Sequence, residues 1–424
     1  MFFKWQILPK LLVLIFLGSS GLPLMAAEKI SSSAVDQGLV FALQATLTYH
    51  PAIKGKQAEL DAQSYTVDSA KAGRYPTLSL QANNLNDELN QGSVRLQQPL
   101  WTFGKINNAI QRAEANYTAE QWALLQVQRQ LIEQTAVTYA RVQGIKAREQ
   151  VADENITQHE QLFQRIQRRQ QGLLDTEADV MLARSRLVQA RVQRQKIRGE
   201  LLVALSELQS LTQIFVAADS PVDEQLAELP TVQKVELLAL DNSADLQLKR
   251  ERLKVAELAI KQEKSASKPN LYLQVDHDVG DSQINTQRTR YGINFVASYE
   301  GLGFTGRGQV KIAVARSNAA RYDVDATLSD VKQRVSMLML NRKVQQDSLQ
   351  SQREVVDSIG ETLASFMRQY QSGRKTWVEV LNTQRELTQQ RLQLSQIHND
   401  WLILSLRVAT LIGNLDQQTD RQAL

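Results

Sequence analysis

The chain has 424 residues, with 19 glycines, 8 prolines and no cysteine. It is 43% hydrophobic and 22% charged, which excludes disordered, collagen-like and disulfide-stapled proteins. The formal net charge is +4, and the charges are interspersed, so no basic stripe indicates nucleic acid as a partner. Glycine and proline are scarce enough to predict very long helices rather than the frequent turns of an α/β enzyme.

Residues 1–27 have the order of a secretory signal peptide. Lys4 and Lys10 precede the apolar run 11–17, and the small residues Ala26 and Ala27 follow. The apolar run is far shorter than the roughly 20 residues that a membrane-spanning helix needs. We therefore predict export and removal of this segment. No later segment has 18 consecutive apolar residues, so insertion into a membrane would have to use strands.

The chain is predicted to contain two structural repeats, 28–220 and 221–424, related by an offset of about 200 residues. The offset is clearest on a heptad series that pairs Val180 with Val380, Leu187 with Leu387, Leu201 with Trp401 and Leu208 with Val408. Five unbroken heptads favour helices packed side by side in a coiled coil over ordinary amphipathic helices.

Each repeat is predicted to have the same order of elements. A first helix covers about 36–72 or 232–265, a β-hairpin 75–100 or 269–300, a long helix 105–171 or 309–372, and a return helix 175–212 or 376–412. At 1.5 Å per residue, each long helix would measure roughly 100 Å. Gly172 and Gly373 are predicted to end the long helices, because glycine readily adopts the left-handed conformation of a helix end.

The four predicted strands alternate between apolar and polar residues. The apolar face contains Leu78, Leu80, Ala82, Val94, Leu96, Leu100, Leu271, Leu273, Val275, Val279, Tyr291, Ile293, Phe295 and Ala297. Each strand has about ten residues, the length of a tilted strand that crosses a bilayer. The alternative is a four-stranded sheet packed on a helix in a soluble domain. Four strands are too few to close a barrel, so a lipid-facing sheet would require several chains to share one barrel.

The turn between the last two helices carries the most specific resemblance to a known family. Residues 370–382, YQSGRKTWVEVLN, are similar to the YxVGTRTxxDVLxAQ turn of the TolC-like outer-membrane efflux family. Residues 171–180 resemble the VGLxxxxDV turn of that family with one extra residue, and 99–104 resemble its strand-to-helix corner. The resemblance covers essentially the whole mature chain.

The resemblance implies a mainly α fold with a transmembrane β portion. A homotrimer would share a β-barrel with four strands per chain, continued by a long coiled-coil α-helical barrel in the periplasm. The implied location is the outer membrane of a Gram-negative bacterium, in contact with lipid. The implied partners are a periplasmic adaptor (membrane fusion) protein and an inner-membrane ABC or RND transporter.

Carried over residue by residue, the resemblance also implies a gate. Asp179, Tyr370 and Lys375 match residues that lock the periplasmic entrance, and Glu379 and Asn382 match a constriction ring. The second ring position is acidic in the family but Asn382 here, and Lys375 replaces an arginine, so both the ring and the lock would be weaker. The turn residues Gly172, Leu173, Gly373 and Arg374 would face the adaptor. The alternative for Asp179 and Glu379 is ordinary helix capping.

Residues 301–306 spell GxGxxG between a strand and a helix, as a dinucleotide site requires. The next helix is several times too long for a crossover and no parallel strand follows, so the motif is interpreted as a hinge between barrel and tunnel. The hinge comprises Gly104, Gly301, Gly303 and Gly306. Four scattered histidines and no cysteine offer no metal site. We therefore expect no enzyme activity, no cofactor and no metal.

The function that these observations favour is export through a trimeric channel-tunnel that serves an inner-membrane transporter and its adaptor. The export would serve type I protein secretion or multidrug efflux; the cargo stays open between secreted proteins, drugs and metal ions, with a lean towards type I protein secretion. The alternative is a soluble periplasmic coiled-coil adaptor or structural protein without a pore, because such a protein would have equally long helices.

Overall fold

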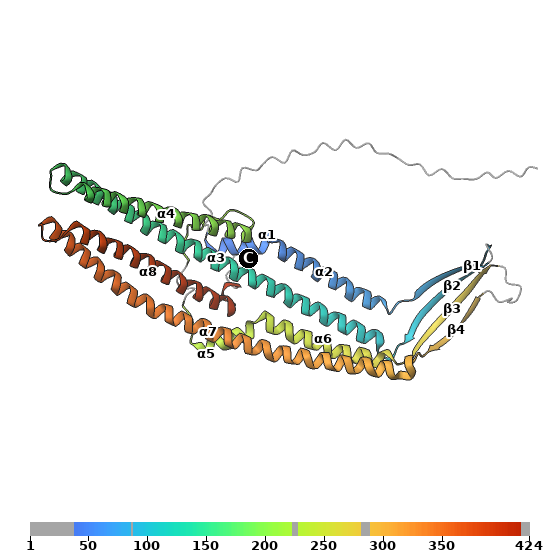
Figure 1. Ribbon diagram of the computed structural model, residues 1–424. Helices are drawn as coiled ribbons and strands as arrows, with labels where there is room; N and C mark the ends of the chain where they lie inside the picture. The colour runs from blue at the N-terminus through green and yellow to red at the C-terminus, as the bar shows by residue number, and fades with distance from the viewer. Residues whose placement is uncertain (1–37, 86–87, 223–227, 281–288, 417–424) are drawn as a thin grey trace, which may run out of the picture. The chain divides into compact units, whose positions relative to one another are not determined.

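The computed structural model describes residues 38–85, 88–222, 228–280 and 289–416. The signal peptide predicted at 1–27 lies outside the described residues. The described elements repeat one order twice (Figure 1). The first repeat contains α1 (Leu39–Tyr49), α2 (Pro51–Ala72), β1 (Thr77–Leu85), β2 (Glu88–Trp101), α3 (Lys105–Gln171) and α4 (Glu177–Thr212). The second contains α5 (Val232–Asn242), α6 (Ala244–Ala266), β3 (Asn270–Gly280), β4 (Thr289–Val296), the short 3₁₀ helix η2 (Glu300–Gly303), α7 (Phe304–Gln371) and α8 (Trp377–Leu411).

The prediction of one continuous first helix per repeat was wrong. The first repeat breaks at His50, whose backbone is extended (φ −65°, ψ 126°), because Pro51 begins the next helix and the residue before a proline avoids the α conformation. The second breaks at Ser243, also extended (φ −64°, ψ 105°). Its hydroxyl oxygen accepts a hydrogen bond from the Leu246 N–H at 3.2 Å and so caps α6.

The described helices lie side by side in a fixed lateral order. At the end near the strands, α2 contacts α3, α3 contacts α6, and α6 contacts α7. At the other end, where α3 joins α4 and α7 joins α8, the order is α4, α3, α8, α7. Helix α3 is central in both sets and contributes the fully buried residues Ala136, Tyr139, Ala140 and Val142 to the main core. Consequently α2 and α4 form one lateral edge of the chain and α7 forms the other.

The four strands form one antiparallel sheet in the order β1-β2-β3-β4. One row across the sheet pairs Leu78 with Leu96, Leu96 with Val275, and Val275 with Tyr291, so the apolar residues predicted from alternation share one face. Much of that face is exposed in the single chain. Within the described residues, β1 and β4 each have a strand on one side only.

The opposite face of the sheet is polar, and several of its side chains pair with one another. The Arg95 guanidinium contacts the Asp276 carboxylate at 2.6 Å, and Arg290 contacts Asp278 at 2.9 Å. Gln97 and Asn294 both donate to Oε1 of Gln274, at 2.9 and 2.8 Å. None of the helices in the described ranges combines the length and apolar composition required to span a membrane.

Helices α3 and α8 approach each other closely at Gly144. A Cβ at this position would lie 2.7 Å from Cβ of Asn399, closer than any real contact, and would also overlap the amide group of that residue. Asn399 is buried on α8, so it has little space into which to move. Only glycine lets the two helices approach at this separation.

We expect Gly144→Ala to destabilise the protein by about 1–3 kcal/mol, because the added methyl overpacks the α3–α8 crossing. Gly360→Ala in α7 is the matched control. A Cβ there meets no atom within 4 Å, so alanine should gain about 0.5–1 kcal/mol from helix propensity. Thermal unfolding followed by circular dichroism measures both. Equal effects of the two substitutions would contradict the close crossing.

Candidate functional site at the helical hairpin turns

The turns that join α3 to α4 and α7 to α8 have the same backbone hydrogen bonds, offset by 200 residues. In the first, the Leu174 N–H donates to the Arg169 carbonyl at 2.9 Å; in the second, the Arg374 N–H donates to the Gln369 carbonyl at 2.9 Å. Inside each of these bonds lies a second one that spans fewer residues: the Leu173 N–H donates to the Gln170 carbonyl, and the Gly373 N–H donates to the Tyr370 carbonyl. This pair of bonds is the Schellman helix ending.

The left-handed position of this ending is occupied by Leu173 in the first turn (φ 59°) and by Gly373 in the second (φ 74°). The prediction that Gly172 supplies the first left-handed residue was therefore wrong, because its φ is −85°. A leucine in this conformation costs roughly 1–2 kcal/mol. Its side chain is 93% exposed, so contacts within the chain do not offset that cost. Leu174 is also exposed, and the first turn presents two apolar side chains.

Both return helices begin with a capping box. The Thr176 hydroxyl accepts from the Asp179 N–H at 3.2 Å, while the Asp179 carboxylate accepts from the Thr176 N–H at 2.9 Å. Thr376 and Glu379 make the same pair of bonds, at 3.4 and 3.0 Å. Within the single chain, both acids therefore perform the capping that the sequence left as the alternative to gating.

The residue before each cap has opposite charge in the two turns. Lys375 Nζ contacts Glu379 Oε1 at 2.6 Å and lies 4.3 Å from the centre of the Phe366 ring. The equivalent residue in the first turn is Asp175, which forms a two-pronged ion pair with Arg169 at 3.0 and 3.3 Å. The Lys375 ammonium, followed by the N–H and hydroxyl of Thr376, lowers the pKa of Glu379 to about 2.

Tyr370 joins the two hairpins at their ends. It packs in a buried cluster whose other members are Leu162, Ile166, Ala183, Trp377, Val380 and Leu381. The Arg169 guanidinium of the first hairpin lies 5.3 Å from the centre of the Tyr370 ring. The phenolic oxygen is buried and has no hydrogen-bond partner within the described part of the chain, and burial raises the pKa of Tyr370.

The residues of the predicted lock therefore lie at the same end of the chain without bonding to one another there. Asp179 is held by Thr176, and its pKa is lowered first by the Thr176 hydroxyl and more weakly by the Trp377 indole. Lys375 is held by Glu379. Sequence reasoning missed Arg169 and Trp377 as contacts of this region. The sequence did contain one signal that the two turns differ in their contacts: at the 200-residue offset, Asp175 is replaced by Lys375.

Glu379 and Asn382 lie one turn apart on the solvent side of α8. Asn382 is exposed and Glu379 is half-buried, whereas Val380 and Leu381 between them are buried in the cluster that joins the hairpins. Residues at this spacing share one helix face. The two side chains predicted to form the constriction ring thus point away from the core of their own chain.

The corners between strands and long helices use consecutive left-handed residues. Phe103 (φ 49°) precedes Gly104 (φ 88°), and Leu302 (φ 56°) precedes Gly303 (φ 88°). Gly303 therefore matches Gly104 in position and backbone conformation, whereas Gly306, which was predicted to belong to the hinge, already lies inside α7. Gly301 is also left-handed (φ 57°). The GxGxxG motif thus forms a tight helix entry.

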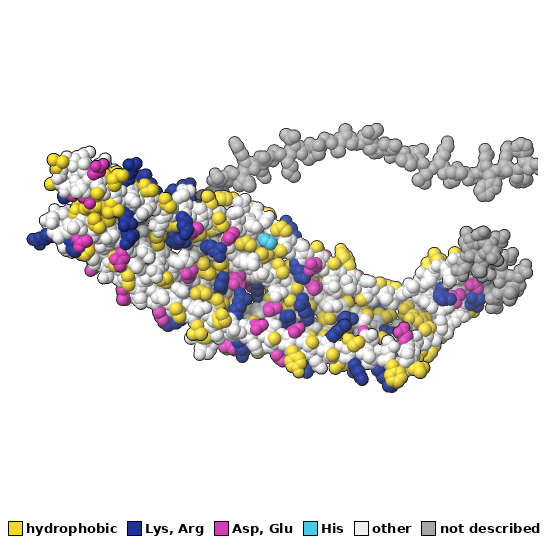
Figure 2. Space-filling model, viewed as in Figure 1, with side chains coloured by type: hydrophobic (Ala, Val, Ile, Leu, Met, Phe, Trp, Pro, Cys, Tyr) yellow, Lys and Arg dark blue, Asp and Glu magenta, His cyan; other side chains and the backbone are white. Residues whose placement is uncertain are grey.

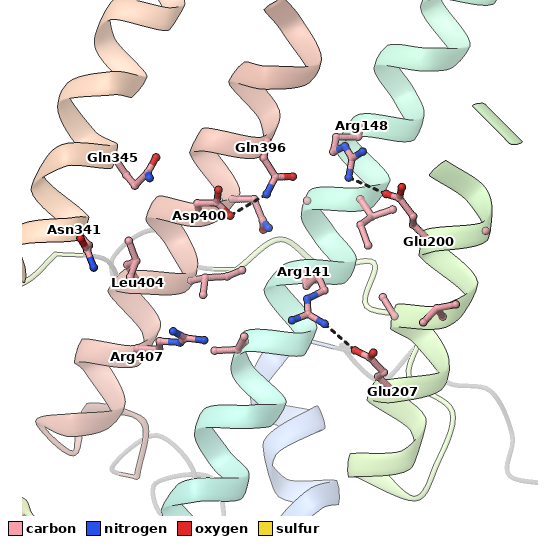
Figure 3. A pocket seen from close by; sticks show the side chains of 18 residues that line it. Arg141, Arg148, Glu200, Glu207, Asn341, Gln345, Gln396, Asp400, Leu404 and Arg407 are labelled. Carbon is pink, nitrogen blue, oxygen red and sulfur yellow. Dashed lines mark hydrogen bonds and ion pairs between the residues drawn. The ribbon is translucent and has the colours of Figure 1, made fainter. Parts of the chain in front are cut away.

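A groove of about 800 Å³ runs between the two hairpins and is lined by α3, α4, α7 and α8 (Figure 3). On one wall Arg141 contacts Glu207 at 2.8 Å and Arg148 contacts Glu200 at 3.0 Å. On the other, Gln396 donates to Asp400 at 2.9 Å, and burial raises the pKa of Asp400. No sequence motif predicted this groove. Its charges are largely satisfied within the chain, and no group of three potential metal ligands occurs among the described residues.

The comparisons with known proteins agree with this architecture. A family model described as "Outer membrane efflux protein" matches residues 42–212 and 237–414. The chain is 24% identical to the outer membrane protein TolC of Salmonella enteritidis, over 94% of this chain and 86% of TolC.

Two crystal structures have the same fold. CusC superimposes with a TM-score of 0.78 at 18% identity, covering 89% of this chain and 92% of CusC. The outer membrane protein VceC of Vibrio cholerae gives 0.75 at 17% identity, covering 88% and 96%. The predicted fold class, mainly α with a β portion and two internal repeats, is confirmed.

We expect Gly373→Ala to destabilise the second turn by about 1 kcal/mol, because alanine is strained at a φ of 74°. Gly172→Ala is the control, since its φ is negative and a Cβ would meet the Arg169 carbonyl at an ordinary 3.5 Å. Hydrogen exchange of the amides in the two turns measures the difference. Faster exchange in Gly172→Ala than in Gly373→Ala would contradict the assignment of the left-handed positions.

The start of α8 should resist acid. Because the pKa of Glu379 in the folded chain is about 2, below its ordinary 4.5, its stabilising contribution is complete above pH 4.5 and is lost as the pH falls to about 2. Lys375→Ala should move the midpoint upwards towards 4.5, and Lys343→Ala, which removes an exposed ion pair elsewhere on α7, should not. A ¹³C chemical-shift titration of the Glu379 carboxyl measures this. An unchanged midpoint in Lys375→Ala would refute the pairing.

Proposed function

The chain belongs to the outer membrane efflux protein family, and from this premise we propose that it is a trimeric channel-tunnel exporting substrates from an inner-membrane transporter and adaptor complex. The protein is located in the outer membrane of a Gram-negative bacterium. Members of the family are channels, and we infer that this chain likewise transports and does not catalyse a reaction. The soluble adaptor considered from the sequence does not account for a sheet with a broad exposed apolar face.

The observation that carries the proposal is a lipid-compatible sheet with two open edges. In a bilayer, unpaired N–H and C=O groups of β1 and β4 would have no hydrogen-bond partner, so the sheet has to close. Four strands cannot close a barrel alone. Pairing of β4 in one copy with β1 in the next closes a ring, and three copies supply twelve strands.

The helices support the same ring. Helix α4 has a buried apolar seam against α3 and a second, exposed seam formed by Met181, Val188, Val192 and Leu202. Helix α7 exposes Met337, Leu340 and Val344 at the other lateral edge. The edge with β1 carries α4, and the edge with β4 carries α7. Closing the barrel would therefore place the outer face of α4 in one copy against the outer face of α7 in the next.

The polar face of the sheet would then line water. Its two ion pairs per chain leave no net charge, so the barrel offers a polar path without a strong charge barrier. Selectivity would arise at the turns, where three copies of Glu379 and Asn382 form the constriction ring. Since Lys375 already pairs with Glu379, the ring is less negative than three free carboxylates.

The entrance residues complete the proposal. Asp179, Tyr370 and Lys375 would hold neighbouring hairpins together in a closed state, and the unpaired phenol of Tyr370 is a donor that such a contact could use. Gly172, Leu173, Gly373 and Arg374 would face the periplasmic adaptor, which connects the tunnel to an ABC or RND transporter. We propose proteins or drugs as cargo, because the path is polar and wide rather than a specific pocket.

Val188→Glu combined with Val192→Glu should convert the trimer into monomers, because both side chains lie on the exposed α4 seam and charges there would be buried between copies. The control is Gln189→Glu with Gln193→Glu, exposed neighbours on the same helix. Sedimentation in detergent measures the mass. A monomeric wild-type protein, or a trimeric valine variant, would refute the proposed edge.

Planar-bilayer recording tests the channel directly. We expect Asp179→Ala or Lys375→Ala to raise single-channel conductance, and Glu379→Ala to reduce cation preference. Lys375→Ala should also raise cation preference, because it frees the Glu379 carboxylate. Glu177→Ala, an exposed acid in the same region that makes no cap, is the control. Absence of any pore would sink the channel proposal, and unchanged conductance and selectivity in all variants would sink the residue roles.

A further inference from the structure

Large apolar side chains are exposed at the corners where the strands meet the helices. They are Tyr75, Trp101, Phe103, Tyr299, Leu302 and Phe304. Three of the four corners are represented: α2 to β1, β2 to α3, and β4 to α7. In sequence, the corner residues of β4 and α7 follow the end of the exposed apolar face of the sheet, whose last residue in β4 is Phe295. Aromatic residues at the border of a lipid-facing band are typical of the membrane–water interface.

Two of these side chains are held outward by strained backbone. Phe103 and Leu302 are both left-handed, each directly before the glycine that begins a long helix. Glycine would adopt this conformation without strain. Leu302 is 92% exposed, so packing within the chain does not offset the strain. Burial of the Leu302 side chain in an apolar environment outside the chain would offset this strain.

Basic side chains accompany the apolar ones at all four corners. They are Arg74, Lys105, Lys268 and Arg307. None of the four has an acidic partner in the part of the chain that the structure describes, although ion pairs are frequent along the helices. Arg74 donates to the neutral Asn107 Oδ1 at 3.1 Å, and the Arg307 guanidinium lies 5.7 Å from the centre of the Phe304 ring. Hydrophobic and basic side chains lie side by side at the strand end of α7 (Figure 2).

The helix ends at these corners add to the positive potential. Helices α3 and α7 both begin there, with no side-chain cap and no acidic residue in the first turn. Helices α4 and α8, in contrast, begin with an acidic capping box. At the corner between β4 and α7, the acid closest in sequence is the exposed Glu300. Positive helix ends with basic neighbours favour an external anion.

We propose that these corner residues form a collar that binds anionic phospholipid headgroups at the periplasmic surface of the outer membrane. The apolar side chains would lie at the boundary between headgroups and acyl chains, and the four basic side chains would contact phosphates. Bilayer lipid is the occupant because the collar is continuous with the lipid-facing sheet. The proposal rests on the membrane insertion in the proposed function, and it assigns the collar a role in fixing the depth of the barrel.

Native mass spectrometry of the delipidated protein tests the headgroup preference. Titrated with phosphatidylglycerol or phosphatidylcholine, the wild type should bind several-fold more phosphatidylglycerol. The variant Arg74→Gln, Lys105→Gln, Lys268→Gln, Arg307→Gln should lose that preference. The control variant Lys54→Gln, Arg184→Gln, Lys196→Gln, Arg198→Gln likewise removes two lysines and two arginines, all four of them exposed on helices. It should keep the preference for phosphatidylglycerol. No preference in the wild type, or loss in both variants, would overturn the proposal.

Depth is tested with Trp101, the tryptophan of the sheet, in bilayers that contain lipids brominated at different acyl positions. Quenching should be strongest for bromines nearest the headgroup and should disappear in Trp101→Phe. Leu302→Gly separates lipid contact from a local structural role, because it relieves strain. It should unfold at a higher temperature in detergent yet show deeper or more variable Trp101 quenching in bilayers. Unchanged quenching would overturn the anchor, while retained conductance would leave the channel itself intact.

Discussion

The requirement that every backbone N–H and C=O in a bilayer find a partner governs this molecule. The sheet of one chain has an exposed apolar face, and within the described residues its outer edges at β1 and β4 are unpaired; in the proposed channel these edges would pair between copies to close a barrel. The helices inherit the lateral order of the strands, because each long helix follows a strand after only a short corner. In the proposed trimer, the strand edges that close the barrel would therefore also decide which helix faces meet in the periplasm.

Duplication gives the two halves one backbone but different side-chain chemistry. The two hairpin turns have the same hydrogen bonds and the same capping boxes. Leu173 and Gly373 differ at an exposed position, and Asp175 and Lys375 differ at a position where each side chain is ion-paired within its own chain. The shared part stabilises the ends of the helices, and the proposed contacts with partners and the proposed gate would depend on the part that differs.

Period-two alternation and the heptads were enough to predict the sheet, its two faces and the long hairpins, because these follow from local patterns. Pro51 predicts a helix break at the residue before it, and this indication was overlooked. No proline or comparable residue predicts the break at Ser243. Gly172 and Gly306 misled because a glycine in a motif does not reveal which residue has positive φ. The contact of Arg169 with Tyr370 joins distant segments, and no single-sequence pattern encodes such pairs.

The opposite charges of Asp175 and Lys375 have a consequence for symmetry. A ring of three copies would present six turns that are nearly equivalent in backbone, so its shape would repeat six times around the axis. Its charge pattern would repeat only three times, because a turn with the Arg169–Asp175 pair alternates with a turn with the Lys375–Glu379 pair. Any partner built from identical subunits that contacts all six turns would therefore encounter two electrostatically distinct environments, and would have to bind them with unequal strength.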